Sequence, residues 1–235
     1  MDDCTPFRPV TYLKHEQISY LLAKLILSGA YTAGMHLPAR ADLCKQYGAD
    51  VETIDMVAAI LLSKRLIARR GPSCFQVLPE QMWNLLDVEV LDWVSEMPDA
   101  FLAIARSFSQ VQYALDPELA AAAAISASPH DVAALAAACA QIERAEFDPV
   151  GAAEGRLLFS EILTLSANNQ IALALYSSFN AIMRRIFQVE IMDAGVMAVH
   201  YGHIVEAIRK GDAGAARRAM TVFADHRKHF DFRMA

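Results

Sequence analysis

The sequence predicts a mainly α-helical protein in two parts, and two observations carry that prediction. Residues 1–79 contain three helix-like segments and one hairpin signal, whereas the chain from Trp83 onward is almost wholly helical in pattern. The charge divides at the same place: residues 1–79 hold nine Lys/Arg against seven Asp/Glu, and the remainder holds twelve against twenty. A slightly basic N-terminal part followed by an acidic remainder is typical of a DNA-binding unit joined to a domain with another role.

The N-terminal elements follow from periodicity and from breakers. The first helix is predicted by Ile18, Leu21, Leu22, Leu25 and Ile26, and it should stop near "SGAYTAG". A short second helix is expected over 39–47, ended by Gly48, and a third follows within "GADVETIDMVAAILLSKRLI". "LIARRGPSCFQVLP" then reads as two β-like arms around a Gly-Pro turn. Three helices and a hairpin in this order form a winged helix-turn-helix with a β-hairpin wing.

The remainder predicts an all-α antiparallel helical bundle of six or seven helices, reached through a linker helix in "WNLLDVEVLDWV". Helix starts are indicated where a capping residue precedes a proline, at Asp116-Pro117, Ser128-Pro129 and Asp148-Pro149. Gly211-Asp212 should end one helix and cap the next. The expected division is 1–80 for the DNA-binding domain, 81–97 for the linker helix and 98–235 for an effector-binding and dimerisation domain.

Several segments, in order along nearly the whole chain, resemble a known family. "ISYLLAKLILSGAYTAGMHLP" and the hairpin resemble the N-terminal domain of GntR-type bacterial transcription regulators. "WNLLDVEVLDW" resembles the linker of the FadR subfamily, especially its sugar-acid-responsive, galactonate-regulator-like members. "LDPELAAAAA", "SANNQ" and "HIVEAIRKGDAGAARRAM" resemble the FCD ligand-binding domain. The resemblance implies a dimeric regulator that binds a double-stranded DNA operator and is controlled by a small organic or sugar acid effector.

The third helix departs from that family at the residues expected to face DNA. The resemblance implies two DNA-contacting arginines, whose positions are Val51 and Asp55 here, and Asp50 and Glu52 add further acids. A carboxylate repels the duplex, so two alternatives stand: the acids accept hydrogen bonds from cytosine amino groups, or the fold has lost most of its DNA affinity. The predicted DNA-binding residues are Arg40, Thr53, Lys64, Arg65, Arg69, Arg70 and Gly71.

The C-terminal domain departs in a similar way. Most FCD domains hold a divalent metal through one Asp and three His, and the matching positions here are Arg156, Ser160, Tyr201 and Phe223. Arginine and phenylalanine do not ligate a divalent cation, so no metal and no cofactor are expected. Arg156 instead supplies a fixed positive charge that fits a carboxylate. The alternative is that Arg156 faces solvent or pairs with Glu154 or Glu161. The predicted effector-binding residues are Gln112, Arg156, Ser160, Asn168, His200, Tyr201 and Phe223.

Composition and motifs narrow the function classes. Hydrophobic residues make up 55% of the chain and charged residues 20%, which fits a packed globular protein. The four cysteines show no metal-binding spacing, and the acidic start of the chain lacks a signal peptide, so a cytoplasmic protein without membrane association is expected. No nucleophile motif or Gly-rich phosphate loop argues for an enzyme. The rival to a regulator is a ligand sensor or interaction protein that does not bind DNA, built on the same scaffold.

Overall fold

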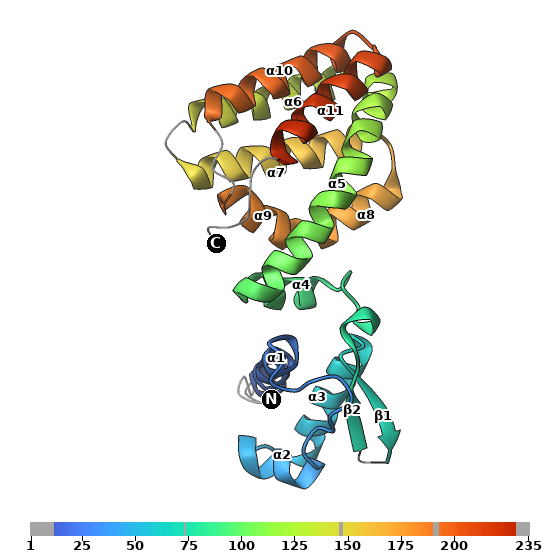
Figure 1. Ribbon diagram of the computed structural model, residues 1–235, viewed down its shortest axis with the longest axis vertical. Helices are drawn as coiled ribbons and strands as arrows, with labels where there is room; N and C mark the ends of the chain where they lie inside the picture. The colour runs from blue at the N-terminus through green and yellow to red at the C-terminus, as the bar shows by residue number, and fades with distance from the viewer. Residues whose placement is uncertain (1–11, 73, 146–147, 190–192, 229–235) are drawn as a thin grey trace, which may run out of the picture. The chain divides into compact units, whose positions relative to one another are not determined.

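The computed structural model describes residues 12–72, 74–145, 148–189 and 193–228 and divides into two compact units, Met1–Met97 and Pro98–Ala235. Both units are built mainly from α-helices, and the two strands belong to the first (Figure 1). The prediction of a mainly α-helical chain with one small hairpin is therefore confirmed.

The N-terminal unit contains three helices followed by a two-stranded antiparallel sheet. Ile67 pairs with Val77 and Arg69 with Phe75, and a bulge lies between Arg69 and Gly71. Gly48 ends the second helix in the left-handed region (φ 56°), which a glycine adopts without strain. The elements are α1 (Tyr12–Leu27), α2 (Arg40–Tyr47), α3 (Val51–Ser63), β1 (Ile67–Gly71), β2 (Cys74–Val77), the 3-10 turn Glu80–Met82 and α4 (Val88–Ser95).

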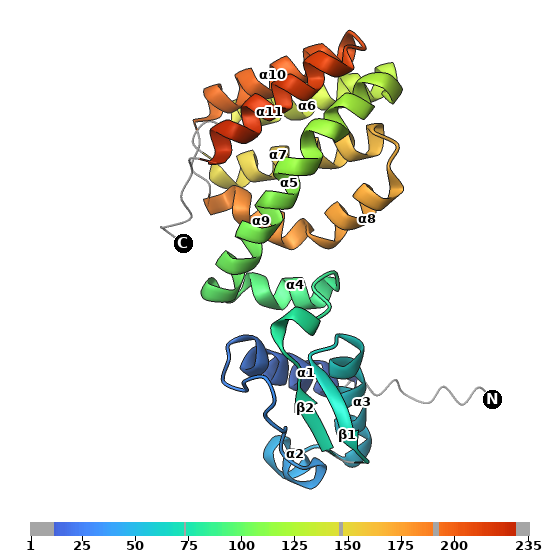
Figure 2. The ribbon, with the colours of Figure 1, turned by 45° about the vertical axis from the view of Figure 1, so that its right-hand side comes forward.

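The core of this unit lies between α1, α3 and the hairpin. Leu22 on α1, Leu61 on α3 and Phe75 on β2 are all buried. The buried positions of α3 recur at helical spacing and leave the opposite face of that helix to solvent. The hairpin stands beside α3 in Figures 1 and 2.

Lys64 binds the segment that follows the hairpin, residues 87–93, to the rest of this unit. Its ammonium donates to Asp87 Oδ1 at 2.7 Å, lies 2.5 Å from Glu89 Oε2 and sits 5.3 Å from the centre of the Trp93 ring. Burial alone would lower the pKa of Lys64, but the two carboxylates outweigh it and the pKa is raised. The fold thus fixes α4 against the end of α3.

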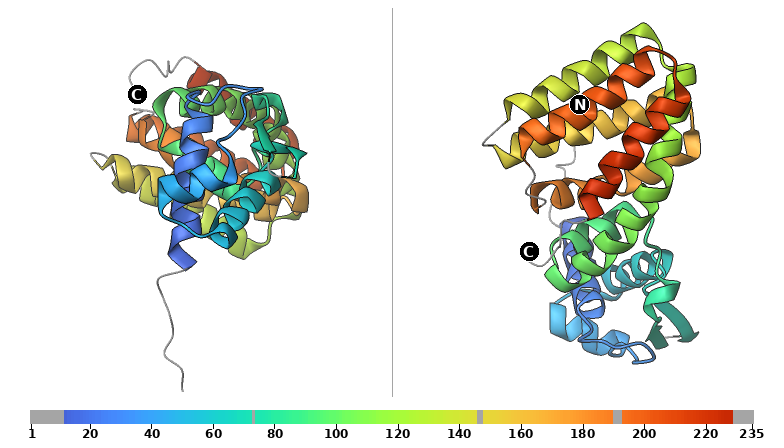
Figure 3. Two further views of the ribbon diagram at one scale, coloured as in Figure 1. Left: turned by 90° about the horizontal axis from the view of Figure 1, so that it is seen from below. Right: turned by 45° about the horizontal axis from the view of Figure 1, so that its top comes forward.

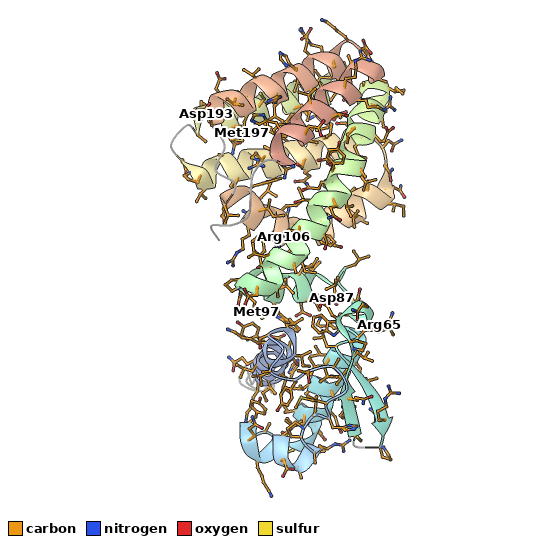
Figure 4. All side chains as sticks on the ribbon, in the orientation of Figure 1. Arg65, Asp87, Met97, Arg106, Asp193 and Met197 are labelled. Atoms are coloured by element: carbon orange, nitrogen blue, oxygen red, sulfur yellow. The ribbon has the colours of Figure 1, made fainter. Side chains whose placement is uncertain are left out.

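The linker helix begins later than its sequence suggested. Trp83 has an extended backbone and its indole N–H donates to the Leu78 carbonyl, so helix α4 starts only at Val88. Asp87 caps this start by accepting from the backbone N–H of Val90. Asp87 and Met97 lie at the two ends of α4 in Figure 4. The capping carboxylate and the Lys64 ion pair therefore share one residue.

The second unit is an all-α bundle. Ser128 and Asp131 form a capping box at one predicted helix start, and Asp148 caps the other by accepting from Val150 N–H. Two of the three predicted Xaa-Pro starts, Ser128-Pro129 and Asp148-Pro149, are thus confirmed, and Gly211 (φ 70°) ends a helix as expected. The helices are α5 (Pro98–Ser126), α6 (Pro129–Arg144), α7 (Pro149–Ser166), α8 (Gln170–Ser178), α9 (Asn180–Val189), α10 (Ala194–Arg209) and α11 (Ala213–Lys228).

The predicted helix start at Asp116-Pro117 is wrong. α5 runs without interruption from Pro98 to Ser126, with Pro117 buried inside it. The Asp116 carboxylate does not cap a backbone N–H; it accepts a hydrogen bond from the Tyr176 hydroxyl of α8. A proline costs an interior helix one hydrogen bond, and this helix is held on both sides of it by buried alanine and phenylalanine side chains.

Helix α7 runs through the middle of this bundle. It contacts α6 on one side and α8 and α9 on the other, while α5 packs along α11 (Figures 1 and 2). Helices α6 and α10 lie side by side, as the right-hand view of Figure 3 shows. Buried side chains of α7 therefore face several helices at once.

No helix within the described part of the chain is both long and apolar enough to cross a bilayer. Cys44, Cys74 and Cys139 are free thiols, and Cys4 lies outside the described residues.

Candidate nucleic-acid interface and ligand cavity

The solvent face of α3 carries acids and apolar side chains but no base. Its exposed positions follow helical spacing and include two carboxylates, whereas Asp50 is the N-cap and accepts from Thr53 N–H at 2.7 Å. That hydrogen bond lowers the pKa of Asp50. One of the three acids thus has a structural role, as a helix cap. The exposed face is formed by Val51, Glu52, Asp55, Met56 and Ala59.

Asp55 forms an ion pair with the predicted DNA-contacting residue Arg40. The Arg40 Nη2 atom of α2 lies 2.9 Å from Asp55 Oδ1, and both side chains are partly exposed (31% and 46%). The pair is solvent-facing, so it contributes little to stability. The pair places the positive charge of Arg40 against a carboxylate of the α3 face.

Two of the predicted DNA-binding residues face inward. Thr53 is 2% exposed and lies in the core side of α3. Lys64 is 4% exposed, and its charge is held by Asp87 and Glu89. Neither side chain can reach a phosphate from these positions, and both are removed from the DNA-facing set.

The wing presents the remaining basic residues. Arg69 Nη1 donates to the Pro72 carbonyl and its guanidinium lies 5.1 Å from the Phe75 ring centre, while Arg70 Nε donates to Gln76 Oε1 at 2.7 Å. Both side chains and that of Arg65 are exposed, and Arg65 is marked beside the hairpin in Figure 4. Gly71 ends β1 at the hairpin turn. These contacts orient cationic groups without neutralising them.

The helical unit encloses a small cavity between α5, α7, α8, α9, α10 and α11. Its free volume of about 10 Å³ gives room for a single water molecule. Three residues at the metal-ligand positions of the related family line it: Ser160, Tyr201 and Phe223. The full lining is Asp116, Phe159, Ser160, Leu163, Thr164, Tyr176, Phe187, Tyr201, Met220, Phe223 and Arg227.

Arg156, at the fourth of those positions, is buried beside the cavity. It is 1% exposed, its guanidinium stacks 3.9 Å from the Phe187 ring centre, and Nη1 donates to the Phe187 carbonyl at 3.4 Å. Burial raises the pKa of the neighbouring Tyr201 hydroxyl, and Arg156 opposes that rise. The solvent-facing alternative for Arg156 is therefore wrong, and Glu154 pairs with Arg184 instead.

The sequence reasoning missed three titratable residues of the cavity wall: Asp116, Tyr176 and Arg227. The Tyr176 hydroxyl donates to Asp116 Oδ1. Burial raises the pKa of Asp116 to about 6, which the hydrogen bond from Tyr176 and the charge of Arg227 only partly oppose. Arg227 shares one face of α11 with Met220 and Phe223, and this spacing of three and four was the available signal.

The other predicted effector residues do not line the cavity. Gln112 is buried within α5 at another position, and Asn168 is exposed in the turn after α7, where its backbone is left-handed (φ 52°). His200 packs against Phe223 and His226 from α10, at ring-centre distances of 5.5 and 5.2 Å, and burial lowers its pKa. None of these three side chains is part of the cavity wall.

The cavity does not fit a divalent metal. Its polar groups are one guanidinium ion, one carboxylate, two phenols and two hydroxyls. A cation would meet the like charge of Arg227 in the wall and of Arg156 beside it. Within the described ranges, His, Cys, Asp and Glu nowhere gather in threes close enough to hold a metal ion. The buried positive charge would instead attract an anion.

We expect metal to play no part in this unit. Protein purified without chelator should carry less than stoichiometric Zn, Ni or Mn by elemental analysis, and EDTA should leave its melting temperature unchanged. One tightly held transition metal per chain, with a fall in melting temperature after its removal, would contradict the charge argument.

Comparisons with known proteins identify the family of the chain. The profile of the FCD domain matches residues 108–226. The chain is similar to the galactonate operon transcriptional repressor of Escherichia coli K12, with 29% identity over 89% of this chain and 93% of that protein. It is also similar to the HTH-type transcriptional regulator YieP of the same organism, at 25% identity over 87% and 91% of the two chains.

A solved structure shares the fold at low sequence identity. The Lar protein of Listeria monocytogenes, described as controlling expression of the agr system, aligns with a TM-score of 0.55 and 16% identity, covering 98% of this chain and all of that one.

Proposed function

Because the chain belongs to the GntR family of transcription regulators and carries an FCD domain, we propose that it is controlled by a small monocarboxylic acid bound without metal beside Arg156. The chain is a regulator and not an enzyme, in keeping with its relatives. The proposal includes a homodimer whose two winged units bind a double-stranded operator, with half-sites about one helical turn apart.

One observation carries the effector proposal: the positions that would hold a metal lie beside a group of charged side chains, of which Arg156 is buried and Asp116 and Arg227 are partly buried. Arg156 and Arg227 each contribute a positive charge, and Asp116 contributes one negative charge. A carboxylate of the effector would add a negative charge beside these two guanidinium groups. Guanidinium groups form strong charge-assisted hydrogen bonds with carboxylates, so a bound monocarboxylate is expected to stabilise the domain.

A sugar acid is the favoured member of that class. The relative at 29% identity is named for the galactonate operon, and galactonate has one carboxylate. The cavity has room for only about one water in this conformation, so binding requires the surrounding helices to move apart. That movement is the proposed signal from the helical unit, transmitted as a change in dimer geometry.

A labelled DNA fragment from the region upstream of the protein's own gene tests both operator binding and its control by a carboxylate. Fluorescence anisotropy should report binding that Arg69→Ala with Arg70→Ala nearly abolishes and that Arg106→Ala, in the helical unit, leaves unchanged. A panel of mono- and dicarboxylates, including D-galactonate and D-gluconate, should then alter the affinity through at least one monocarboxylate.

The α3 face supports keeping a second candidate in that experiment. With Glu52 and Asp55 exposed and Arg40 paired, the rival is a ligand sensor with little DNA affinity. Carboxylate binding seen by calorimetry, without binding of any duplex DNA at low salt, would favour that rival. Loss of both activities would contradict the regulator and the effector proposals together.

A further inference from the structure

A second cavity lies beside the first, between α7, α8 and α9. It has a free volume of about 180 Å³. Glu161, Ser177 and Asn180 line it and are exposed, so this cavity communicates with solvent. Its lining residues are Leu157, Ser160, Glu161, Leu173, Tyr176, Ser177, Asn180 and Met183. We call it the outer cavity, and the one beside Arg156 the inner cavity.

Tyr176 and Ser160 line both cavities and form the boundary between them. Tyr176 is 6% exposed, stacks edge-on against Phe108 at 5.9 Å, and donates its hydroxyl hydrogen to Asp116 across the inner cavity. Separately, neither cavity reaches the roughly 300 Å³ that small-molecule sites usually have. A movement of Tyr176 away from Asp116 would join them.

The two cavities differ in charge. The inner cavity has Arg227 in its wall and Arg156 beside it, whereas the outer cavity has Glu161 and otherwise neutral polar groups. A second carboxylate in the outer cavity would face Glu161 and be repelled. Hydroxyl groups fit there, because serine and asparagine side chains and a carboxylate all accept or donate hydrogen bonds to them. Leu157, Leu173 and Met183 provide apolar wall for a carbon chain.

We propose that the effector spans both cavities and that Asp116 and Tyr176 select for its hydroxyl groups. This inference rests on the proposed carboxylate site. The carboxylate lies by Arg156 and Arg227, a neighbouring ligand hydroxyl takes the place of the Tyr176 hydroxyl on Asp116, and the hydroxylated tail occupies the outer cavity. The ligand class is a polyhydroxylated monocarboxylate.

The selectivity follows from the cost of removing the tyrosine donor from a partly buried carboxylate. An acid that lacks hydroxyls would break the Tyr176–Asp116 hydrogen bond and give nothing in return. Sites that bond a ligand hydroxyl reject the analogue lacking it by large factors. We expect hexanoate to bind at least about 100-fold more weakly than D-gluconate or D-galactonate.

Two variants of the full-length protein should move this preference in opposite directions. Asp116→Leu keeps a similar side-chain shape, and it should weaken sugar-acid binding, strengthen hexanoate binding and bring their dissociation constants within about tenfold. Tyr176→Phe removes the bond that the ligand must break, so sugar acids should bind more tightly than to the wild type. Glu118→Leu, at an exposed site of the same helix, should change neither ratio.

Isothermal titration calorimetry with the three acids measures these ratios, and circular dichroism checks that each variant is folded. If Asp116→Leu does not fold, Tyr176→Phe still decides, because a merely structural tyrosine would lower sugar-acid affinity when truncated. Equal affinities of hexanoate and the sugar acids for the wild type would overturn the selectivity and leave the carboxylate site standing. Failure of all three to bind would overturn both.

Discussion

Asp55→Arg is expected to raise the affinity of this regulator for duplex DNA by about tenfold or more at low salt. The substitution removes a carboxylate from the exposed face of α3 and adds a guanidinium at the same point. It also releases Arg40, whose guanidinium is held 2.9 Å from Asp55 in the wild type. Two cationic groups per chain would then become available to phosphates.

Salt dependence measures that change directly. Anisotropy titrations over a range of NaCl concentrations should give a steeper slope of log affinity against log salt, by about 0.9 for each phosphate gained. Glu143→Arg makes the same change in net charge at an exposed site of α6, and it should leave the slope near the wild-type value. An equal effect from Glu143→Arg would mean that net charge alone is responsible.

The same variant separates the two alternatives for the acidic α3 face. If Asp55→Arg binds random duplex more tightly but the upstream fragment more weakly, Asp55 reads a base, as a carboxylate can by accepting from a cytosine amino group. If both DNAs bind more tightly, the acids only weaken contact with the groove. The exposed apolar residues Val51 and Met56 remain in either case and can contact thymine methyl groups.

Arg156→Met is expected to abolish most of the rise in melting temperature that a bound sugar acid produces. Methionine keeps an unbranched side chain against Phe187, whereas the charge that faces the carboxylate is lost. Truncating one partner of a buried charge pair costs about 2 kcal/mol or more. The dissociation constant of gluconate should therefore rise by about 30-fold or more.

The helical unit also offers a control arginine, Arg184, and a second possible partner for the carboxylate, Arg227. Arg184→Met removes an arginine that pairs with Glu154 at the surface, and it should leave the ligand-induced shift intact. Arg156→Lys keeps a charge but not the planar fork, so it should retain only part of the shift. An unchanged shift in Arg156→Met that is lost in Arg227→Met would place the carboxylate anchor on α11.

Local signals predicted the helix boundaries where nothing distant competed with them. Ser128-Pro129 and Asp148-Pro149 each cap a helix through backbone N–H groups two or three residues away. Asp116-Pro117 is the same kind of dipeptide with another outcome, because the Asp116 carboxylate turns toward Tyr176, sixty residues further along the chain. Such a partner leaves no trace in a window around Asp116.

The predicted binding residues also differ in whether a partner distant in sequence decides their position. The position of Arg156 was implied by the resemblance to FCD domains, and its burial agrees with a role beside the cavity. Lys64 was grouped with the wing arginines because it adjoins them in sequence, but Asp87 and Glu89 attract it inward. Charge counting along the chain cannot separate a buried ion pair from an exposed cation.

The attachment of α4 through Lys64 also sets how this protein could be recombined with others. A chimera that joined its winged helix to another sensor domain just after β2 would leave Lys64 buried without Asp87, Glu89 and Trp93. Removing the partners of a buried charge is strongly destabilising. The compact unit ends at Met97, and a crossover at the Met97–Pro98 bond would transfer the hairpin, the ion pairs and α4 as a single module.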